Sequence, residues 1–382
     1  MTGKLGCRVF QTGMKIGNYF LGYRMPEYVS GPGSIRQLPA LLQAAQGRKA
    51  GKTGQTGKAG KAAPTGKTGK ATLKGKPAKA LLVTGRHIRK SAFFQAITAD
   101  LDAAGIAYAV FSDLSPNPTD RDVEKGFAYY REQGCTCLVA IGGGGPMDLA
   151  KAIGAKSTHP DWPVKKFQGV LKVGRGMPLL IAVPTTATTG MDALCHAVEA
   201  FTNQRYNTPL EDHLAKDAVR LIHKSLLRAY EEGTDLDARQ DMQLAAFYAG
   251  RAFTRGCVGY VHAVGHTLGG LYNVPHGLAM AVILPHVMRQ YGKAVYPRLA
   301  QLADVCGLAG SDAKEKALHF IAWIEEMNAK MGIPKDFSVI REEDIPQMIA
   351  WAEAEANPLY PTPVTWGEKD FRKLIASIRE DV

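Results

Sequence analysis

The stretch CLVAIGGGGPMDLAKAIG, residues 137–154, decides the fold of the first half of the chain. It opens with an apolar run typical of a buried strand and continues in a helical pattern from Pro146, a residue suited to the first turn of a helix. Between them lie four glycines: Gly142, Gly143, Gly144 and Gly145. Such a turn lets the backbone approach a diphosphate, and the free amides of the helix start attract its charge. The pattern predicts a dinucleotide-binding turn with Asp148 in the first helical turn; a tight turn without a ligand is the alternative.

Strand and helix patterns alternate on both sides of this stretch. The predicted strands are Ala80–Thr84, Ala107–Phe111, Cys137–Ile141 and Leu179–Val183, and the predicted helices lie near Ser91–Ala104, Thr119–Gln133 and Pro146–Ala155. This alternation is typical of a parallel sheet with crossover helices. After Thr189 only helical patterns follow. We therefore expect an α/β dinucleotide-binding domain at residues 1–187 and an all-α domain at 188–382.

The composition fits an ordinary globular protein. Of the 382 residues, 46% are hydrophobic and 21% are charged, which disfavours disorder of the whole chain. No run of about 18 apolar residues is present, so we expect no membrane span. The cysteines form no CxxC pair and at this chain length indicate free thiols. These features, with the lack of an apolar secretion signal, favour a cytoplasmic protein.

The net charge of +12 is concentrated in one segment. Residues 47–79 hold ten basic side chains and no acidic one, which leaves +2 for the rest of the chain. Glycine, lysine, alanine and threonine without apolar periodicity predict a disordered, solvated insert. A polyanion-binding arm is the alternative, and we do not expect nucleic acid as a partner of the globular part.

Two pairs of side chains in the second half suggest a metal site. Asp192 and His196 stand four residues apart, as do His262 and His266, so each pair shares a helical face. His276 follows at a junction between a loop and a helix. Any one of these histidines could be structural, but three histidines with one carboxylate suit Fe²⁺ or Zn²⁺. A metal with an open position lowers the pKa of a bound alcohol, which can then lose hydride to a nicotinamide.

Eight motifs support a resemblance to a known family: YVSGPGSIRQLP (28–39), LLVTG (81–85), NPT (117–119), IGGGGPMDLAKAIG (141–154), AVPTTA (182–187), TGMDALCHAVEAF (189–201), YVHAVGHTLGGLYNVPHGLAMAVILPHVM (260–288) and EANPLYPTPV (355–364). They resemble those of the iron-containing alcohol dehydrogenase family, which has the dehydroquinate synthase-like fold. The resemblance extends over nearly the whole chain outside the insert. It implies an NAD(P)-linked alcohol dehydrogenase or aldehyde reductase that acts on a small alcohol or aldehyde.

The resemblance also implies roles for individual residues. The metal ligands, of iron or alternatively zinc, would be Asp192, His196, His262 and His276. His266 would lie beside the nicotinamide as a proton relay, a role that suits imidazole because it titrates near neutral pH. The residues implied in dinucleotide binding are Gly85, Asn117, Gly142, Gly143, Gly144, Gly145, Asp148, Thr185 and Thr186.

Two departures from the family pattern bear on the cofactor. Members that prefer NAD tend to carry an aspartate where this chain has Gly85, and its absence, with Arg86 and Lys90 nearby, favours NADP over NAD. Family members also continue the PTTA motif into a section of strands and loops that is missing after Ala187. This loss suggests a noncatalytic or degenerate homologue as one alternative. A dehydroquinate synthase-like metal-dependent lyase, which would share the architecture, is another. A homodimer is left open.

Overall fold

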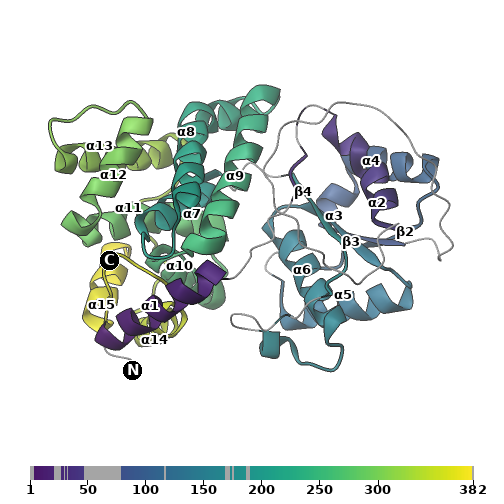
Figure 1. The fold of residues 1–382 in the computed structure, drawn as a ribbon, viewed down its shortest axis with the longest axis horizontal. Coiled ribbons are helices and arrows are strands. Elements are labelled where there is room, and N and C mark those ends of the chain that lie inside the picture. Colours follow the sequence, from purple (N-terminus) through teal and green to yellow (C-terminus); the bar gives the residue numbers. More distant parts are fainter. Residues whose placement is uncertain are drawn as a thin grey trace. The chain divides into compact units, whose positions relative to one another are not determined.

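The computed structural model describes residues 4–20, 27–29, 31, 33–46, 79–115, 118–167, 173, 176–185 and 190–380. It divides into two compact units, one of Gly33–Thr186 and one that joins Met1–Pro32 to Ala187–Val382 (Figure 1). We call them the sheet unit and the helical unit. The predicted insert, apart from Lys79, lies outside the described residues, and so does the predicted junction at Ala187.

The sheet unit contains one four-stranded parallel sheet. The strands are β1 (Ala80–Thr84), β2 (Tyr108–Phe111), β3 (Cys137–Gly142) and β4 (Leu180–Pro184), in the order β2-β1-β3-β4. All neighbours run parallel; Leu82, for example, pairs with both Val110 and Val139. Parallel neighbours require crossover connections, which the helices between the strands supply. The four strands match those predicted from the sequence to within one residue.

Helices cover both faces of this sheet. They are η1 (Ser34–Gln37), α2 (Leu38–Gln46), α3 (Arg86–Arg89), α4 (Ala92–Ala103), α5 (Asp120–Glu132), α6 (Gly144–Thr158) and η2 (Val164–Phe167). Leu82 of β1 packs in one apolar cluster with Phe94 of α4, whereas Leu81 packs in another with Phe127 of α5 and Ile153 of α6. Figure 1 shows α2 and α4 on one side of the sheet and α5 and α6 on the other. A strand buried on both faces is apolar throughout, which is why β1 and β3 are continuous hydrophobic runs.

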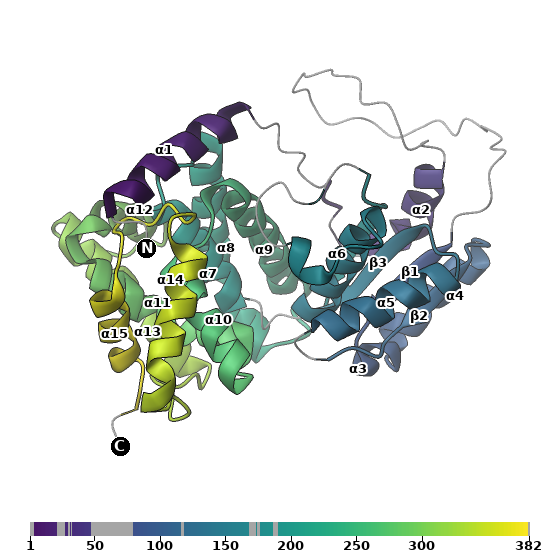
Figure 2. The same cartoon turned by 90° about the horizontal axis from the view of Figure 1, so that it is seen from below.

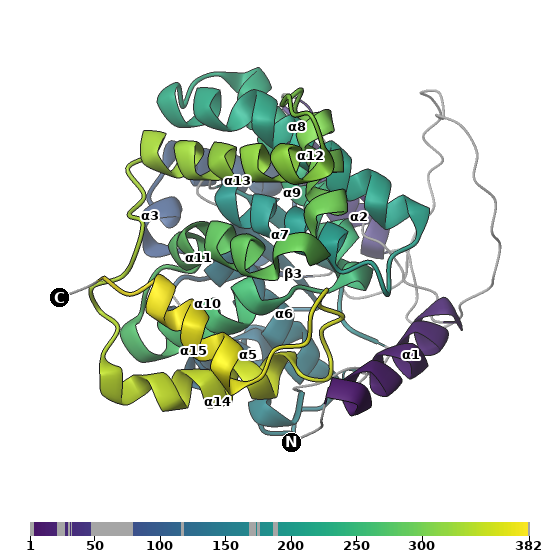
Figure 3. The same cartoon turned by 90° about the vertical axis from the view of Figure 1, so that its left-hand side faces the viewer.

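The described part of the helical unit contains helices and only one isolated β-bridge. The helices are α1 (Lys4–Phe20), α7 (Gly190–Thr202), α8 (Pro209–Glu231), α9 (Leu236–Gly256), α10 (Tyr260–Tyr272), α11 (His276–Tyr291), η3 (Gly292–Ala294), α12 (Tyr296–Val305), α13 (Ala313–Lys330), η4 (Glu342–Asp344), α14 (Ile345–Ala356) and α15 (Glu368–Ser377). The helix α7 is buried along nearly its whole length and packs against α8, α9 and α11 (Figure 3). An α/β part followed by an all-α part is the fold class that the sequence predicts.

The first helix differs from the predicted division of the chain. The sequence analysis placed residues 1–187 together, but α1 belongs to the helical unit. Arg8 donates hydrogen bonds to the carbonyls of Thr362 and Pro363, and the buried side chain of Gln11 donates to the carbonyl of Tyr360. Figure 2 shows α1 beside this loop, which precedes α15. Long-range contacts of this kind leave no local sequence pattern.

Among the described residues, no helix combines the length and the apolar character needed to cross a membrane.

Candidate active site

The helix α7 brings three acidic or histidine side chains to one face. Asp192, His196 and Glu199 stand at positions i, i+4 and i+7, which overlie one another along a helix. The opposite positions, among them Leu194 and Val198, are fully buried in the core of the helical unit. Because packing fixes α7 on those other sides, its polar face is held in one orientation.

The helices α10 and α11 supply the remaining histidines. His262 and His266 lie one turn apart on α10, and His276 is the first residue of α11. Between the two helices, Asn273 adopts a left-handed conformation with φ 56° and ends α10, as asparagine often does. Pro275 then precedes the first turn of α11. This short connection turns the chain so that His276 returns toward the histidines of α10.

Asp192 lies at the centre of this group. Its Oδ2 is 3.6 Å from Nε2 of His196, and its Oδ1 is 3.6 Å from Nε2 of His262 and 3.3 Å from Nε2 of His276. Ligand atoms about 2.1 Å from an ion in a tetrahedral site are about 3.4 Å apart. The separations around Asp192 are compatible with a shared ion, and the ligand atoms of Asp192, His196 and His262 all lie within 4.8 Å of one another. The structure brings together all four residues that the sequence analysis assigned to the metal.

Three buried atoms of this group have no hydrogen-bond partner among the described residues. They are Oδ1 of Asp192, Nδ1 of His196 and Nε2 of His262. An unsatisfied buried polar atom costs about 1–3 kcal/mol, more for a charged group, so three in one small group of residues are unusual. A cation that accepts lone pairs from Oδ1 of Asp192 and Nε2 of His262 would satisfy two of them. The chemistry and spacing of the donor set thus fit a divalent metal ion.

Burial and charge shift the pKa values in this group in opposite directions. Burial raises the pKa of Asp192, but the nearby rings of His262 and His276 outweigh burial and hold the pKa well below its usual range. Burial, with the charge of His262, lowers the pKa of His196 to about 3. Burial also lowers the pKa of His262, but the charges of Glu199 and Asp192 outweigh this and raise it to about 9. The carboxylate of Asp192 is therefore ionised at neutral pH, as a metal ligand must be.

His266 lies at the edge of the group, and its side chain is 43% exposed. Its ring centroid is 5.3 Å from that of His276, and its Nδ1 is 2.8 Å from Oε1 of Glu355 on α14. The same oxygen accepts a hydrogen bond of 2.9 Å from the hydroxyl of Tyr360. Burial, followed by the charge of Glu355, raises the pKa of Tyr360, so its hydroxyl stays protonated. Glu355 thus accepts from two sides and orients the His266 ring.

Sequence reasoning missed both acidic partners of the α10 histidines. Glu199 contacts His262, and its spacing of seven residues from Asp192 could have placed it on the same face of α7. Glu355 contacts His266 across 89 residues of sequence, and no local pattern indicates that contact.

The glycine turn of the sheet unit has the backbone that a diphosphate site requires. Gly142 has φ 152°, and a Cβ atom there would lie 2.7 Å from Cγ of Pro146, so only glycine fits without strain. The helix α6 begins at Gly144, two residues before the predicted start at Pro146. No side chain caps its first turn, which leaves amide groups free to bind an anion.

Two threonine hydroxyls lie near the carboxyl ends of strands in this unit. Oγ1 of Thr84, the last residue of β1, and Oγ1 of Thr185, directly after β4, are buried and have no hydrogen-bond partner among the described residues. Ligands of open parallel sheets bind at this edge. Thr185 also donates its amide to the carbonyl of Gly142, 3.0 Å away, which joins β4 to the glycine turn. Of the predicted dinucleotide residues, Asn117 and Thr186 lie outside the described part of the chain.

The other predicted cofactor residues are exposed or lie beside exposed groups. Asp148 forms an ion pair of 3.2 Å with Lys151 at the surface. Gly85 follows β1 and precedes α3, and a Cβ atom added there would meet nothing within 4 Å. The neighbouring Arg86 forms an exposed ion pair of 2.5 Å with Asp113. The charge of Arg86, which the sequence analysis counted in favour of NADP, is therefore paired with a carboxylate.

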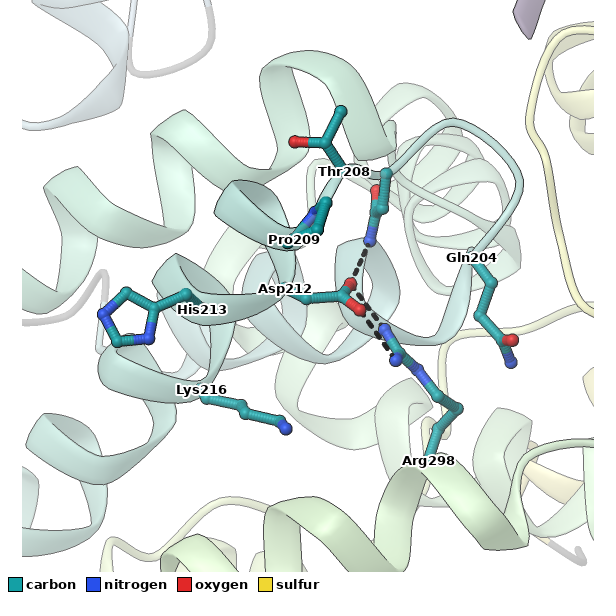
Figure 4. Close-up of a pocket in the computed structure, with 8 residues that line it drawn as sticks. Gln204, Thr208, Pro209, Asp212, His213, Lys216 and Arg298 are labelled. Atoms are coloured by element: carbon teal, nitrogen blue, oxygen red, sulfur yellow. Dashed lines mark hydrogen bonds and ion pairs between the residues drawn. The ribbon is translucent and has the colours of Figure 1, made fainter.

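A polar cavity of about 490 Å³ lies near the start of α8. Figure 4 shows Asp212 facing Arg298, with His213 and Lys216 on the same wall. Arg298 donates to both carboxylate oxygens of Asp212, at 2.6 and 2.8 Å, and Lys216 donates to Gln301. Arg298 and Asp212 pair with each other, and none of the lining residues belongs to the histidine group.

Comparisons with known proteins agree with this geometry. A family model described as "Iron-containing alcohol dehydrogenase" matches residues 59–216, and one described as "Fe-containing alcohol dehydrogenase family, C-terminal" matches residues 186–378. The 1,3-propanediol dehydrogenase of Citrobacter freundii is 34% identical, over 77% of this chain and 90% of that protein. The NAD-dependent methanol dehydrogenase of Bacillus methanolicus is 30% identical, over 70% of this chain and 83% of that protein.

A solved structure agrees as well. The crystal structure of a 1,3-propanediol oxidoreductase superposes with a TM-score of 0.78 and 29% identity, over 92% of this chain and 99% of that one. The predicted resemblance, fold class and class of enzyme are confirmed by these matches. The chain belongs to the iron-containing alcohol dehydrogenase family, a family of enzymes that interconvert alcohols and aldehydes.

Proposed function

We propose that this chain is a metal-dependent alcohol dehydrogenase or aldehyde reductase that transfers hydride between a nicotinamide cofactor and a small alcohol or aldehyde. The observation that supports this most directly is the group of buried, unpaired donor atoms around Asp192. A buried carboxylate among histidines without hydrogen-bond partners is costly unless a cation satisfies it. The dehydrogenases and reductases among the similar proteins support the same reaction class.

The metal would be held by Asp192, His196, His262 and His276. Nε2 of each histidine and the two oxygens of Asp192 are the atoms that approach one another. Three imidazoles and one carboxylate suit Fe²⁺, which the family description supports, and Zn²⁺ as well. When bound, such an ion is a Lewis acid that favours the deprotonated form of an alcohol.

His266 would move the proton of the reaction. Glu355 accepts the hydrogen bond from Nδ1, so the lone pair of the neutral ring lies on Nε2, the atom that is free to accept a proton. With 43% of its side chain exposed, His266 can pass this proton on to solvent. Glu355 would stabilise the charged ring while the proton is held.

The glycine turn would bind the dinucleotide. Gly142, Gly143, Gly144 and Gly145 would receive the diphosphate at the start of α6. Thr185 would line the rest of the site, together with Thr186 and Asn117, which lie outside the described residues, and the unpaired hydroxyl of Thr84 supports the same edge of the sheet. Asp148 would complete the first helical turn, and Gly85 would lie near the adenosine ribose. The absence of a carboxylate at Gly85 supports NADP, whereas the NAD-dependent relative supports NAD.

The same proposal assigns roles to the two units and a location in the cell. The sheet unit and the helical unit would be the dinucleotide-binding and metal-binding domains, with residues 1–32 added to the second. The cysteines in the described part of the chain form no disulfide with one another, which supports a cytoplasmic location because disulfides are rare there.

The experiment that tests the function compares His276→Ala with the wild type. We expect the wild type to contain about one equivalent of metal and to oxidise NADPH or NADH with butanal, and the variant to lose both properties, because a missing ligand also loosens its neighbours. Retained metal and rate in the variant would refute the proposed site. A wild type that binds metal but oxidises neither cofactor would support the noncatalytic alternative.

A further inference from the structure

We propose that Glu199 is a positioning residue that holds His262 in the tautomer and orientation needed to bind the metal. The inference rests on the proposed function, because it presupposes a metal at the histidine group. Glu199 is 1% exposed and lies on α7, whereas His262 lies on α10. The carboxylate therefore links the two helices that carry most of the group.

Each oxygen of Glu199 accepts one hydrogen bond from α10. Oε2 lies 2.5 Å from Nδ1 of His262, and Oε1 lies 2.8 Å from the backbone amide of Val261. That amide belongs to the first turn of α10, where backbone donors have no partner within the helix. The same carboxylate thus caps the helix and contacts the ring of the next residue. Its position is fixed by two bonds, so the ring it contacts is fixed as well.

The direction of the hydrogen bond decides which ring nitrogen is free. A carboxylate can only accept, so Nδ1 of His262 carries the proton that is donated. In the neutral ring the lone pair then lies on Nε2, which is buried, faces Asp192 at 3.6 Å and has no hydrogen-bond partner among the described residues. Acidic partners of this kind orient histidine ligands in many metal sites.

A carboxylate is required here because both neighbours donate. The isosteric glutamine has one accepting oxygen and one donating NH₂ group. If its oxygen faced His262, the NH₂ group would meet the amide of Val261. If the amide group were turned over, its NH₂ group would face Nδ1 of His262 and favour the tautomer with the proton on Nε2. A protonated Nε2 has no lone pair with which to bind a metal. Neither arrangement satisfies both contacts.

The backbone at Gly259 lies close to the side chain of Glu199. A Cβ atom at Gly259 would lie 2.8 Å from Oε1 of Glu199, closer than real Cβ atoms approach an oxygen. Glycine at the start of α10 therefore leaves the space that the carboxylate fills. Replacing it displaces Glu199 without removing any ionisable group.

The test measures the affinity of the metal-free full-length protein for Zn²⁺ and Fe²⁺ by competition with a chromophoric chelator. We expect Glu199→Gln to weaken binding roughly 10–100-fold, the usual effect of losing such a partner. Glu199→Asp keeps two accepting oxygens and should recover part of that loss. The matched control is Glu211→Gln, since Glu211 is 2% exposed, accepts from the backbone amide of Thr208 and forms an ion pair with Arg255, but does not contact a histidine of the group. It should leave the affinity within about twofold.

A double-mutant cycle separates positioning from general support of the fold. In a His262→Ala background, Glu199→Gln should change the remaining metal affinity by no more than about twofold, because the ring it positions is gone. An equal loss in both backgrounds, or wild-type affinity in Glu199→Gln, would overturn the inference. If Glu199→Gln does not fold, Gly259→Ala takes its place, and unchanged affinity there has the same consequence. A wild type that binds neither metal would instead overturn the proposed function.

Discussion

The histidine group of the helical unit is built from side chains, whereas the glycine turn of the sheet unit is built from backbone. The first uses side chains from α7, α10 and α11, with Asp192 at the centre and its unpaired atoms buried. The second uses backbone, with Gly142 at φ 152° and free amides at the start of α6. A side-chain site depends on the packing of three helices, whereas a backbone site depends on one strand, one turn and one helix.

Metal removal should give the largest effect and should act on the helical unit. Chelation of the wild type is expected to abolish aldehyde reduction and to destabilise the metal site, by about 4 kcal/mol relative to protein with metal at 1,000 times its Kd. Hydrogen exchange should show faster exchange in peptides of α7, α10 and α11 and no change in peptides of β1 and β3. Re-addition of Fe²⁺ or Zn²⁺ is the control. Equal changes in both units would contradict the separation of the two sites.

The substitution Gly142→Ala should affect the glycine turn and leave the metal site intact. The added Cβ would lie 2.7 Å from Pro146 in a backbone conformation that disfavours side chains, so we expect a loss of about 1–3 kcal/mol in stability. Binding of NADPH or NADH should weaken as well, whereas metal content should not change. Fluorescence titration with the cofactor and metal analysis measure the two properties.

The matched control for this prediction is Gly134→Ala. Gly134 also has a positive φ, of 63°, but a Cβ atom there would meet nothing within 4 Å. It should cost about 1 kcal/mol in stability and leave cofactor binding unchanged. Similar cofactor affinities in the two variants would show that the turn at Gly142 does not contact the dinucleotide.

The smallest effect is expected from Gly85→Asp, which should change the preference of the enzyme between NAD and NADP. The site has room for the side chain, and a carboxylate would repel a 2′-phosphate and accept from ribose hydroxyls. We expect the ratio of kcat/KM for NAD over NADP to rise about tenfold, or about 1.4 kcal/mol. Gly85→Asn has nearly the same shape without the charge and should change the ratio less. An unchanged ratio in Gly85→Asp would place the adenosine ribose elsewhere.

Much of the fold was predictable because its signals are local. The apolar runs of β1 and β3 and the glycines after β3 identify strands and a turn without any knowledge of the rest of the chain. No helix range was predicted for α1, α2, α3, α14 or α15. Gln11 of α1, for example, is buried and donates to the carbonyl of Tyr360, a contact across 349 residues.

The sequence by itself determined the donor types and their faces, since helical periodicity places Asp192 beside His196, and His262 beside His266. Only the tertiary structure decided which acids orient these histidines. Glu199 reaches His262 across 63 residues of sequence because α7 and α10 belong to one buried core. The helical pattern of 3.6 residues per turn shows which side chains share a face of one helix, but not which helices pack together. Which helices pack together depends on how the whole chain buries its apolar faces.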